Sequence, residues 1–186
     1  MPELNSIGLI EVSSVAVGHL AADAMLKAAS VELLLARSIC SGKFLVAVCG
    51  DVASVGAAVE AGAAVCGVSL IEKRHIAHVH PSVFPAISMA VNFEPDKLRS
   101  LGMVETFSAA SIIEVADAAA KSADVTLLRV HLAMALGGKG FMLLTGDVSS
   151  VESAIATGSR IASEEGMLVG RAVIAAPAKE LFRDYI

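Results

Sequence analysis

The strongest constraint on the fold of this chain is that its two halves repeat one another. Four separated motifs return in the same order: Ile7-Gly8-Leu9-Ile10-Glu11 as Leu101-Gly102-Met103-Val104-Glu105, Ala22-Asp23-Ala24 as Ala116-Asp117-Ala118, Gly42-Lys43 as Gly138-Lys139, and Gly50-Asp51-Val52 as Gly146-Asp147-Val148. The offset is 94 residues for the first two motifs and 96 for the others, so the second half has gained two residues before its glycine loop. Such a pattern indicates two homologous domains, expected at residues 1–92 and 93–186. The segment 92–100, with Pro95 and several charges, is the expected linker.

Hydrophobic periodicity predicts the same elements in each half. They are a first strand (7–12 and 101–106), a helix, two strands joined by a glycine turn (31–39 and 44–48 around 40–43), a helix capped by Asp51 or Asp147, a last strand (68–71 and 168–174) and a short helix (82–89 and 178–183). In the first helix the predicted buried stripe is Val17, Leu20, Ala21, Ala24 and Ala28. The order β-α-β-β-α-β indicates an α+β domain of ferredoxin-like type, with helices covering one face of the sheet.

Composition excludes several classes of function. A net charge of −5 and only seven aromatic residues argue against binding of nucleic acid. The longest stretch without Asp, Glu, Lys or Arg, 75–93, holds three histidines and two prolines, so we expect no membrane span. The first residues lack the pattern of a signal peptide, which favours the cytoplasm. Hydrophobic residues make up 55% of the chain and charged residues only 18%, which predicts apolar surface buried between subunits.

The motifs together resemble the shell-protein domain of bacterial microcompartments. The resemblance rests on the strand Ile7–Glu11, the helix sequence Ala22-Asp-Ala-Met-Leu-Lys-Ala-Ala, the hairpin Ser41-Gly42-Lys43 and Gly50-Asp51-Val52, each followed by its second-half counterpart. Two copies that both begin at the ordinary first strand identify the chain as an unpermuted tandem shell protein. The segments 38–44 and 130–140 look most like the trimeric shell proteins of propanediol-utilisation compartments.

The resemblance implies a homotrimer that imitates a hexagonal hexamer and tiles with other shell proteins around encapsulated redox enzymes. Its central pore would be lined by the hairpin tips, here Cys40, Ser41, Gly42 and Lys43 in the first domain and Leu136, Gly137, Gly138 and Lys139 in the second. In the resembling type, the cysteine of the first tip ligates an iron–sulfur cluster, so Cys40 is the expected metal ligand. One 4Fe-4S cluster per trimer would then lie on the three-fold axis, bound by three thiolates.

Several readings of these residues stay open. The pore without a cluster would pass a metabolite or cofactor instead, and Cys40 would then be a small side chain at a crowded turn. Related proteins place a proline after this cysteine, whereas Ser41 stands here, which predicts a looser loop. Lys43 and Lys139 either attract anions to the pore or pair with acidic neighbours, and pairing is the favoured reading. The glycines of the second tip either offer amide groups to an anion or form a plain turn.

The remaining candidate residues have weaker assignments. Lys27 and Lys121 occupy the place where family members put a lysine at the edge of the tile, and the alternative is an exposed helix lysine. Cys49 and Cys66 are interpreted as core residues, because their neighbours are apolar. His75, His78 and His80 alternate along an extended segment, but without a nearby carboxylate or cysteine a surface role is favoured over metal binding.

Two other functions deserve comparison with the shell reading. An enzyme is not indicated, because the chain contains no nucleophile elbow, Walker loop or H-E-x-x-H motif. A trimeric nucleotide-sensing regulator would need a phosphate site between its subunits, and two-dimensional tiling would argue against it. We therefore expect a structural shell trimer rather than an enzyme.

Overall fold

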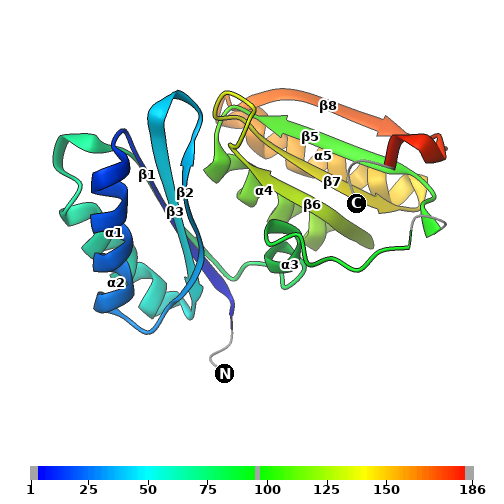
Figure 1. The fold of residues 1–186 in the computed structure, drawn as a ribbon. Coiled ribbons are helices and arrows are strands. Elements are labelled where there is room, and N and C mark those ends of the chain that lie inside the picture. Colours follow the sequence, from blue (N-terminus) through cyan, green and yellow to red (C-terminus); the bar gives the residue numbers. More distant parts are fainter. Residues whose placement is uncertain (1–3, 95–96, 183–186) are drawn as a thin grey trace. The chain divides into compact units, whose positions relative to one another are not determined.

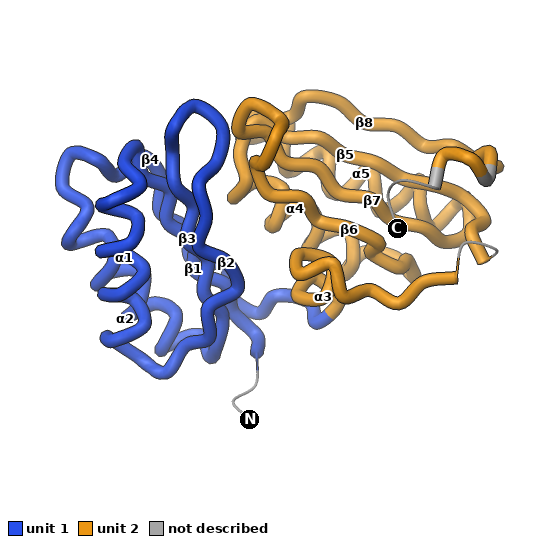
Figure 2. Tube along the Cα trace, in the orientation of Figure 1, with its two compact units in different colours: residues 1–81 blue, residues 82–186 orange. Residues whose placement is uncertain are grey.

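The computed structural model describes residues 4–94 and 97–182 and divides into two compact units, residues 1–81 and 82–186 (Figure 2). Each unit is an α+β domain with one four-stranded antiparallel sheet, as the duplication predicts. The two units are described separately below.

Unit 1 contains six main elements (Figure 1). They are β1 (Ser6–Val12), α1 (Val15–Ala28), β2 (Glu32–Ile39), β3 (Lys43–Gly50), α2 (Val52–Ala64) and β4 (Leu70–Ala77). The sheet order is β2-β3-β1-β4, and every neighbouring pair is antiparallel. This order confirms the ferredoxin-like arrangement expected from the sequence.

Unit 2 repeats this topology after a short helix. Its elements are α3 (Val83–Ile87), β5 (Leu101–Thr106), α4 (Ala109–Ser122), β6 (Val125–Leu132), β7 (Gly140–Gly146), α5 (Val148–Glu164), β8 (Leu168–Ile174) and a 3-10 turn (Lys179–Phe182). The sheet order β6-β7-β5-β8 matches that of unit 1 strand for strand. The helix pairs α1–α2 and α4–α5 each cover one face of their own sheet, so the core of each unit lies between helices and strands (Figure 1).

The buried side of α1 differs from the predicted stripe. Its buried residues are Gly18, Ala21, Ala22 and Met25, whereas Leu20 is 60% exposed. The helix is rotated from the predicted position because Gly18, not a larger apolar residue, faces Phe44 of the sheet. Apolar content alone therefore misplaced the contact face of this helix.

Three element boundaries also differ from the sequence-based expectation. The last strand of unit 1 runs over Leu70–Ala77 instead of 68–71, because its charged side chains alternate on an edge strand and hide the pattern. Helix α3 packs on β6 and α4, so the contacts divide the chain at residue 81 while the domain boundary at residue 92 stays a prediction. Arg183, in the last predicted helix, and Pro95, in the linker, lie outside the described residues.

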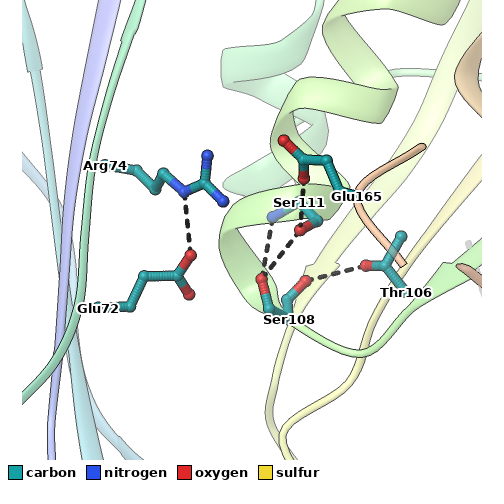
Figure 3. A network of polar contacts seen from close by, with 6 residues as sticks. All are labelled: Glu72, Arg74, Thr106, Ser108, Ser111 and Glu165. Atoms are coloured by element: carbon teal, nitrogen blue, oxygen red, sulfur yellow. Dashed lines mark hydrogen bonds and ion pairs between the residues drawn. The ribbon is translucent and has the colours of Figure 1, made fainter. Parts of the chain in front are cut away.

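Serine hydroxyls begin the first helix of each unit. Ser14 accepts a hydrogen bond from the backbone N–H of Val17, and Ser108 accepts one from Ser111 at 3.1 Å. In unit 2 this cap belongs to a small network, because the Ser111 hydroxyl donates to Glu165 at 3.4 Å (Figure 3). The caps fix where each helix starts and therefore its position along the sheet.

The second helices begin differently from one another. Asp51 accepts the N–H of Ser54 at 2.9 Å, and these hydrogen bonds lower the pKa of its carboxyl. Asp147 was predicted to cap α5 in the same way, but its side chain makes no capping bond and pairs with Arg99 at 2.6 Å. The arginine draws the carboxylate away from the end of the helix.

Helix length and polarity do not suit a bilayer. Within residues 4–94 and 97–182, none of the helices is both long enough and apolar enough to span a membrane.

Candidate functional site

The first candidate tip is a tight turn between β2 and β3. Ile39 pairs with Lys43 across the hairpin, and Cys40, Ser41 and Gly42 form the connecting turn. Ser41 has φ 64° and ψ 25°, and Gly42 has φ 72°, so two consecutive residues occupy the left-handed region. Cys40 is partly exposed beside them. The three predicted tip residues thus lie together at the end of one hairpin.

The conformation of Ser41 has a consequence for the proline of related proteins. Proline is restricted to φ near −65°, so it cannot adopt the backbone found at Ser41. The tip of this chain therefore has a different conformation from a tip with Cys-Pro, which gives a physical basis to the departure noted in the sequence.

Replacing Ser41 tests this conformation directly. Ser41→Gly is expected to stabilise the fold by about 0.5–1 kcal/mol, because glycine occupies the left-handed region without strain. Ser41→Pro is expected to destabilise it by at least about 1 kcal/mol. Chemical denaturation measures both, and a proline variant as stable as the parent would contradict the left-handed turn.

The second candidate tip lies in a longer connection between β6 and β7. The Lys139 N–H donates to the Leu136 carbonyl at 3.3 Å, and the two residues between them, Gly137 and Gly138, have φ 66° and 92°. Positive φ at both central residues is the pattern of a type I′ turn, which glycine accommodates best. A plain glycine turn accounts for this tip.

A histidine braces this longer connection. The His131 ring lies against Phe141 with 4.9 Å between centroids, and its Nε2 is 2.6 Å from the Met134 carbonyl oxygen. The Arg129 guanidinium lies over the other side of the cluster, 5.7 Å from the Phe141 centroid. Sequence analysis missed this brace, since nothing in the first domain has a histidine at the corresponding place.

Both tip lysines are held in ion pairs at the base of their hairpins. Lys43 Nζ lies 2.8 Å from Glu11 of β1, and Lys139 Nζ lies 2.5 Å from Glu105 of β5. These four residues are homologous pairs, so the arrangement occurs once in each unit. Pairing supports the favoured reading that the lysines do not carry free charge to the tip. The glutamates were missed as site residues, although their recurrence in both halves was a usable signal.

The Glu11 pair is expected to contribute more to stability than its counterpart. The Glu11 side chain is 6% exposed and that of Glu105 is 30% exposed. Glu11→Gln should therefore lower the free energy of unfolding by about 1–2 kcal/mol, because it leaves Lys43 without its buried partner. Glu105→Gln should cost less than about 1 kcal/mol. Urea titration of the two variants measures the difference, and equal losses would contradict the role of burial.

The two other cysteines belong to the core, as predicted. Cys49 is buried, and burial together with the charge of Glu32 raises the pKa of its thiol to about 11. Cys66 is also buried, its pKa is raised by burial, and its Sγ donates to the Gly62 carbonyl at 3.0 Å. Both stay protonated at neutral pH, which makes them poor metal ligands.

The predicted edge lysines take matching positions in the two units. Lys27 pairs with Asp23 at 2.6 Å in the last turns of α1, and Lys121 pairs with Asp117 at 2.7 Å in α4. Both lysine side chains are exposed. Their role at a tile edge stays a prediction.

The histidines of the first unit do not form a metal site. His75 lies on β4, where its Nε2 is 3.0 Å from the Ser6 hydroxyl, and His78 has φ 56° in the bend that follows. Among the residues that the structure describes, there is no group of three histidine, cysteine or acidic side chains able to hold a metal ion. A metal held by Cys40 therefore needs ligands from beyond one chain.

Comparison with known families matches both units. The family model described as the BMC domain matches residues 6–80 and again 100–177, which together cover most of the chain. The chain belongs to the BMC domain family. Its two BMC domains agree with the duplication in the sequence and with the two homologous sheets.

Individual relatives support a tandem shell protein. The bacterial microcompartment shell protein PduT of Citrobacter freundii is 44% identical over 181 residues, which cover 97% of each chain. The carboxysome shell protein CsoS1C of Hydrogenovibrio crunogenus is 37% identical over 95 residues, half of this chain and 92% of its own. A microcompartment protein of Desulfitobacterium hafniense DCB, known from its crystal structure, is 49% identical with a TM-score of 0.93, covering 97% of this chain and 99% of its own. The chain is a structural shell protein of bacterial microcompartments.

Proposed function

We propose that the protein is a trimeric tile of the shell whose central pore holds one 4Fe-4S cluster on Cys40. The observation that carries the proposal is the placement of Cys40 at a hairpin tip, partly exposed, while Cys49 and Cys66 are buried. The similarity to PduT over 97% of both chains supports a tile of the same kind.

The donor set fits a cluster only in an assembly. A cubane cluster has four irons that each need a ligand, and cysteine thiolate is the usual one. One chain offers a single tip cysteine, and the homologous tip of unit 2 has Gly138 instead, so it adds none. Three chains around a three-fold axis would supply three thiolates and leave one iron for water or a small molecule.

The ion pairs at the hairpin bases suit this role. Because Lys43 is bound to Glu11, it is directed toward β1 and the tip is tied to the central strand. A tip whose base is fixed holds its cysteine more precisely, which cluster retention requires. The bound cluster would supply one-electron transfer across the shell, with encapsulated redox enzymes as the expected electron donors or acceptors.

A second candidate keeps the tile but leaves its pore open. An added Cβ at Gly137 or Gly138 would meet nothing within 4 Å, so the second tip lies in open space and fills it with no side chain. An open pore lined in part by such backbone would pass a small metabolite or cofactor. Here Cys40 would only pack at its turn.

Native mass spectrometry of protein purified without oxygen separates these functions. A mass of three times the 19.0 kDa chain plus one four-iron, four-sulfide unit is expected for the cluster-bearing tile. A trimer that stays bare after reconstitution with iron and sulfide would support the open pore. A monomer would overturn the trimeric tile itself.

A further inference from the structure

The two units bury opposite surfaces of the same domain. In α1, three large apolar side chains are exposed: Val15 at 42%, Leu20 at 60% and Leu26 at 41%. The helix α4 is homologous, with an offset of 94 residues, and at the positions of Val15 and Leu26 it carries Ala109 and Ala120, both buried. The apolar outer side of α1, defined here by Val15, Leu20 and Leu26, is therefore uncovered only in unit 1.

The sheet shows the reverse asymmetry. On the face of the unit 2 sheet away from its helices there is a cavity of about 400 Å³, lined mainly by Leu101, Met103, Leu136, Phe141, Leu143 and Ile174. Met103 and Ile174 are 37% and 38% exposed. The homologous residues in unit 1, Leu9 and Ile76, are buried.

An apolar helix side and an apolar sheet cavity on one chain cannot cover each other's counterparts in a closed pair of identical contacts. One surface belongs to unit 1 and the other to unit 2, so a contact between them is heterologous: the helix side of one copy meets the cavity of the next. Such contacts continue around a ring until it closes. A volume of about 400 Å³ lies in the range that buried side chains or ligands fill.

We infer that the outer side of α1 in one copy of the chain seats in the sheet cavity of unit 2 of a second copy. The occupant is another copy because the apolar side that would fill the cavity stands uncovered on the same chain. The low charged content of 18% fits a chain that buries such surface on assembly. The inference rests on the ring assembly proposed above and names the surfaces that form it.

Methionine oxidation tests the contact in the unmodified protein. Met103 is partly exposed in the single chain, so hydrogen peroxide should convert it to the sulfoxide readily unless a second copy covers it. In the assembled protein we expect its oxidation, measured by peptide mass spectrometry, to be at least about tenfold slower than in a Leu20→Glu variant. A change in unit 1 would then expose a residue of unit 2, which only contact between copies explains.

Native mass spectrometry of variants gives the second readout. Leu20→Glu and Met103→Glu should each raise the dissociation constant of the assembly by about 100-fold or more, because each buries a charge at the contact. Val68→Glu is the matched control, since Val68 is fully exposed and lies on neither surface. Circular dichroism of the dissociated variants verifies that they remain folded.

The outcomes separate this inference from the proposed function. A wild-type monomer would overturn both. A wild-type trimer whose Met103 oxidises at the same rate in wild type and Leu20→Glu, or whose mass withstands both variants, would overturn only the contact. A trimer in which Leu20→Glu dissociates but Met103→Glu does not would show that something other than α1 fills the cavity, which also overturns it.

Discussion

A Cys40→Ala variant purified without oxygen is expected to contain no iron, whereas the parent contains about 1.3 iron atoms per chain, four shared by three. The loss is complete because the substitution removes one ligand from every chain of the ring. The trimer mass should be unchanged, since Cys40 lies at the turn between β2 and β3 rather than in a strand. Iron analysis and native mass spectrometry measure the two quantities on the same sample.

Cys66→Ala is the matched control for this experiment. Its thiol is buried and donates a hydrogen bond within α2, so its removal should lower stability by about 1 kcal/mol and leave the iron content unchanged. Iron retained by Cys40→Ala would reject Cys40 as the ligand. Equal iron loss in both variants would show that misfolding, rather than ligand loss, removes the metal.

Gly18→Ala is expected to destabilise unit 1 by about 2–3 kcal/mol, despite the gain of about 1 kcal/mol that alanine brings to a helix. An added Cβ would lie 2.3 Å from Cδ1 of Phe44 and 2.7 Å from its Cβ. Because the nearest atoms include the root of the Phe44 side chain, rotation of the ring cannot relieve the overlap. Thermal or chemical unfolding measures the loss.

Gly56→Ala provides the control, since it also adds a methyl group to a helix. There the new Cβ would lie 3.3 Å from the ring of His75, whose exposed side chain can move. We expect stability to be unchanged or higher by up to about 1 kcal/mol. A loss as large as that of Gly18→Ala would contradict the steric explanation.

The second unit contains the same contact with its sizes exchanged. Ile112 and Gly140 stand at the positions homologous to Gly18 and Phe44, and a Cβ at Gly140 would lie 2.5 Å from Ile112. The double variant Gly18→Ile with Phe44→Gly should therefore be more stable than the sum of its single effects predicts, by about 2 kcal/mol or more. Additive losses would show that the two positions do not share one space.

The duplication made most of the fold predictable, because each half provided a second reading of the same elements. Local periodicity failed where a structural choice depends on distant residues. Gly18 faces the core only because Phe44 fills the space above it, and no helical pattern in the sequence of α1 shows that. The charged edge strand β4 was shortened in the prediction for a related reason, since its pattern reflects exposure rather than burial.

The candidate site was predictable in its position but not in its internal contacts. Cys40 was placed at a hairpin tip by the glycine turn and by resemblance, and the structure puts it there. The partner of Lys43 is 32 residues away in sequence, on a strand that becomes its neighbour only in the folded sheet. The left-handed backbone of Ser41 was equally hidden, because serine does not by itself announce that conformation.

The unequal hairpins show how cheaply this domain accommodates extra sequence. The connection between β2 and β3 has three residues, 40–42, and that between β6 and β7 has seven, 133–139, yet both join the same strand pair. By the entropy of loop closure, this lengthening costs only about 0.7 kcal/mol. The β6–β7 connection is therefore a suitable graft site, where an engineered peptide could be inserted without redesigning the sheet.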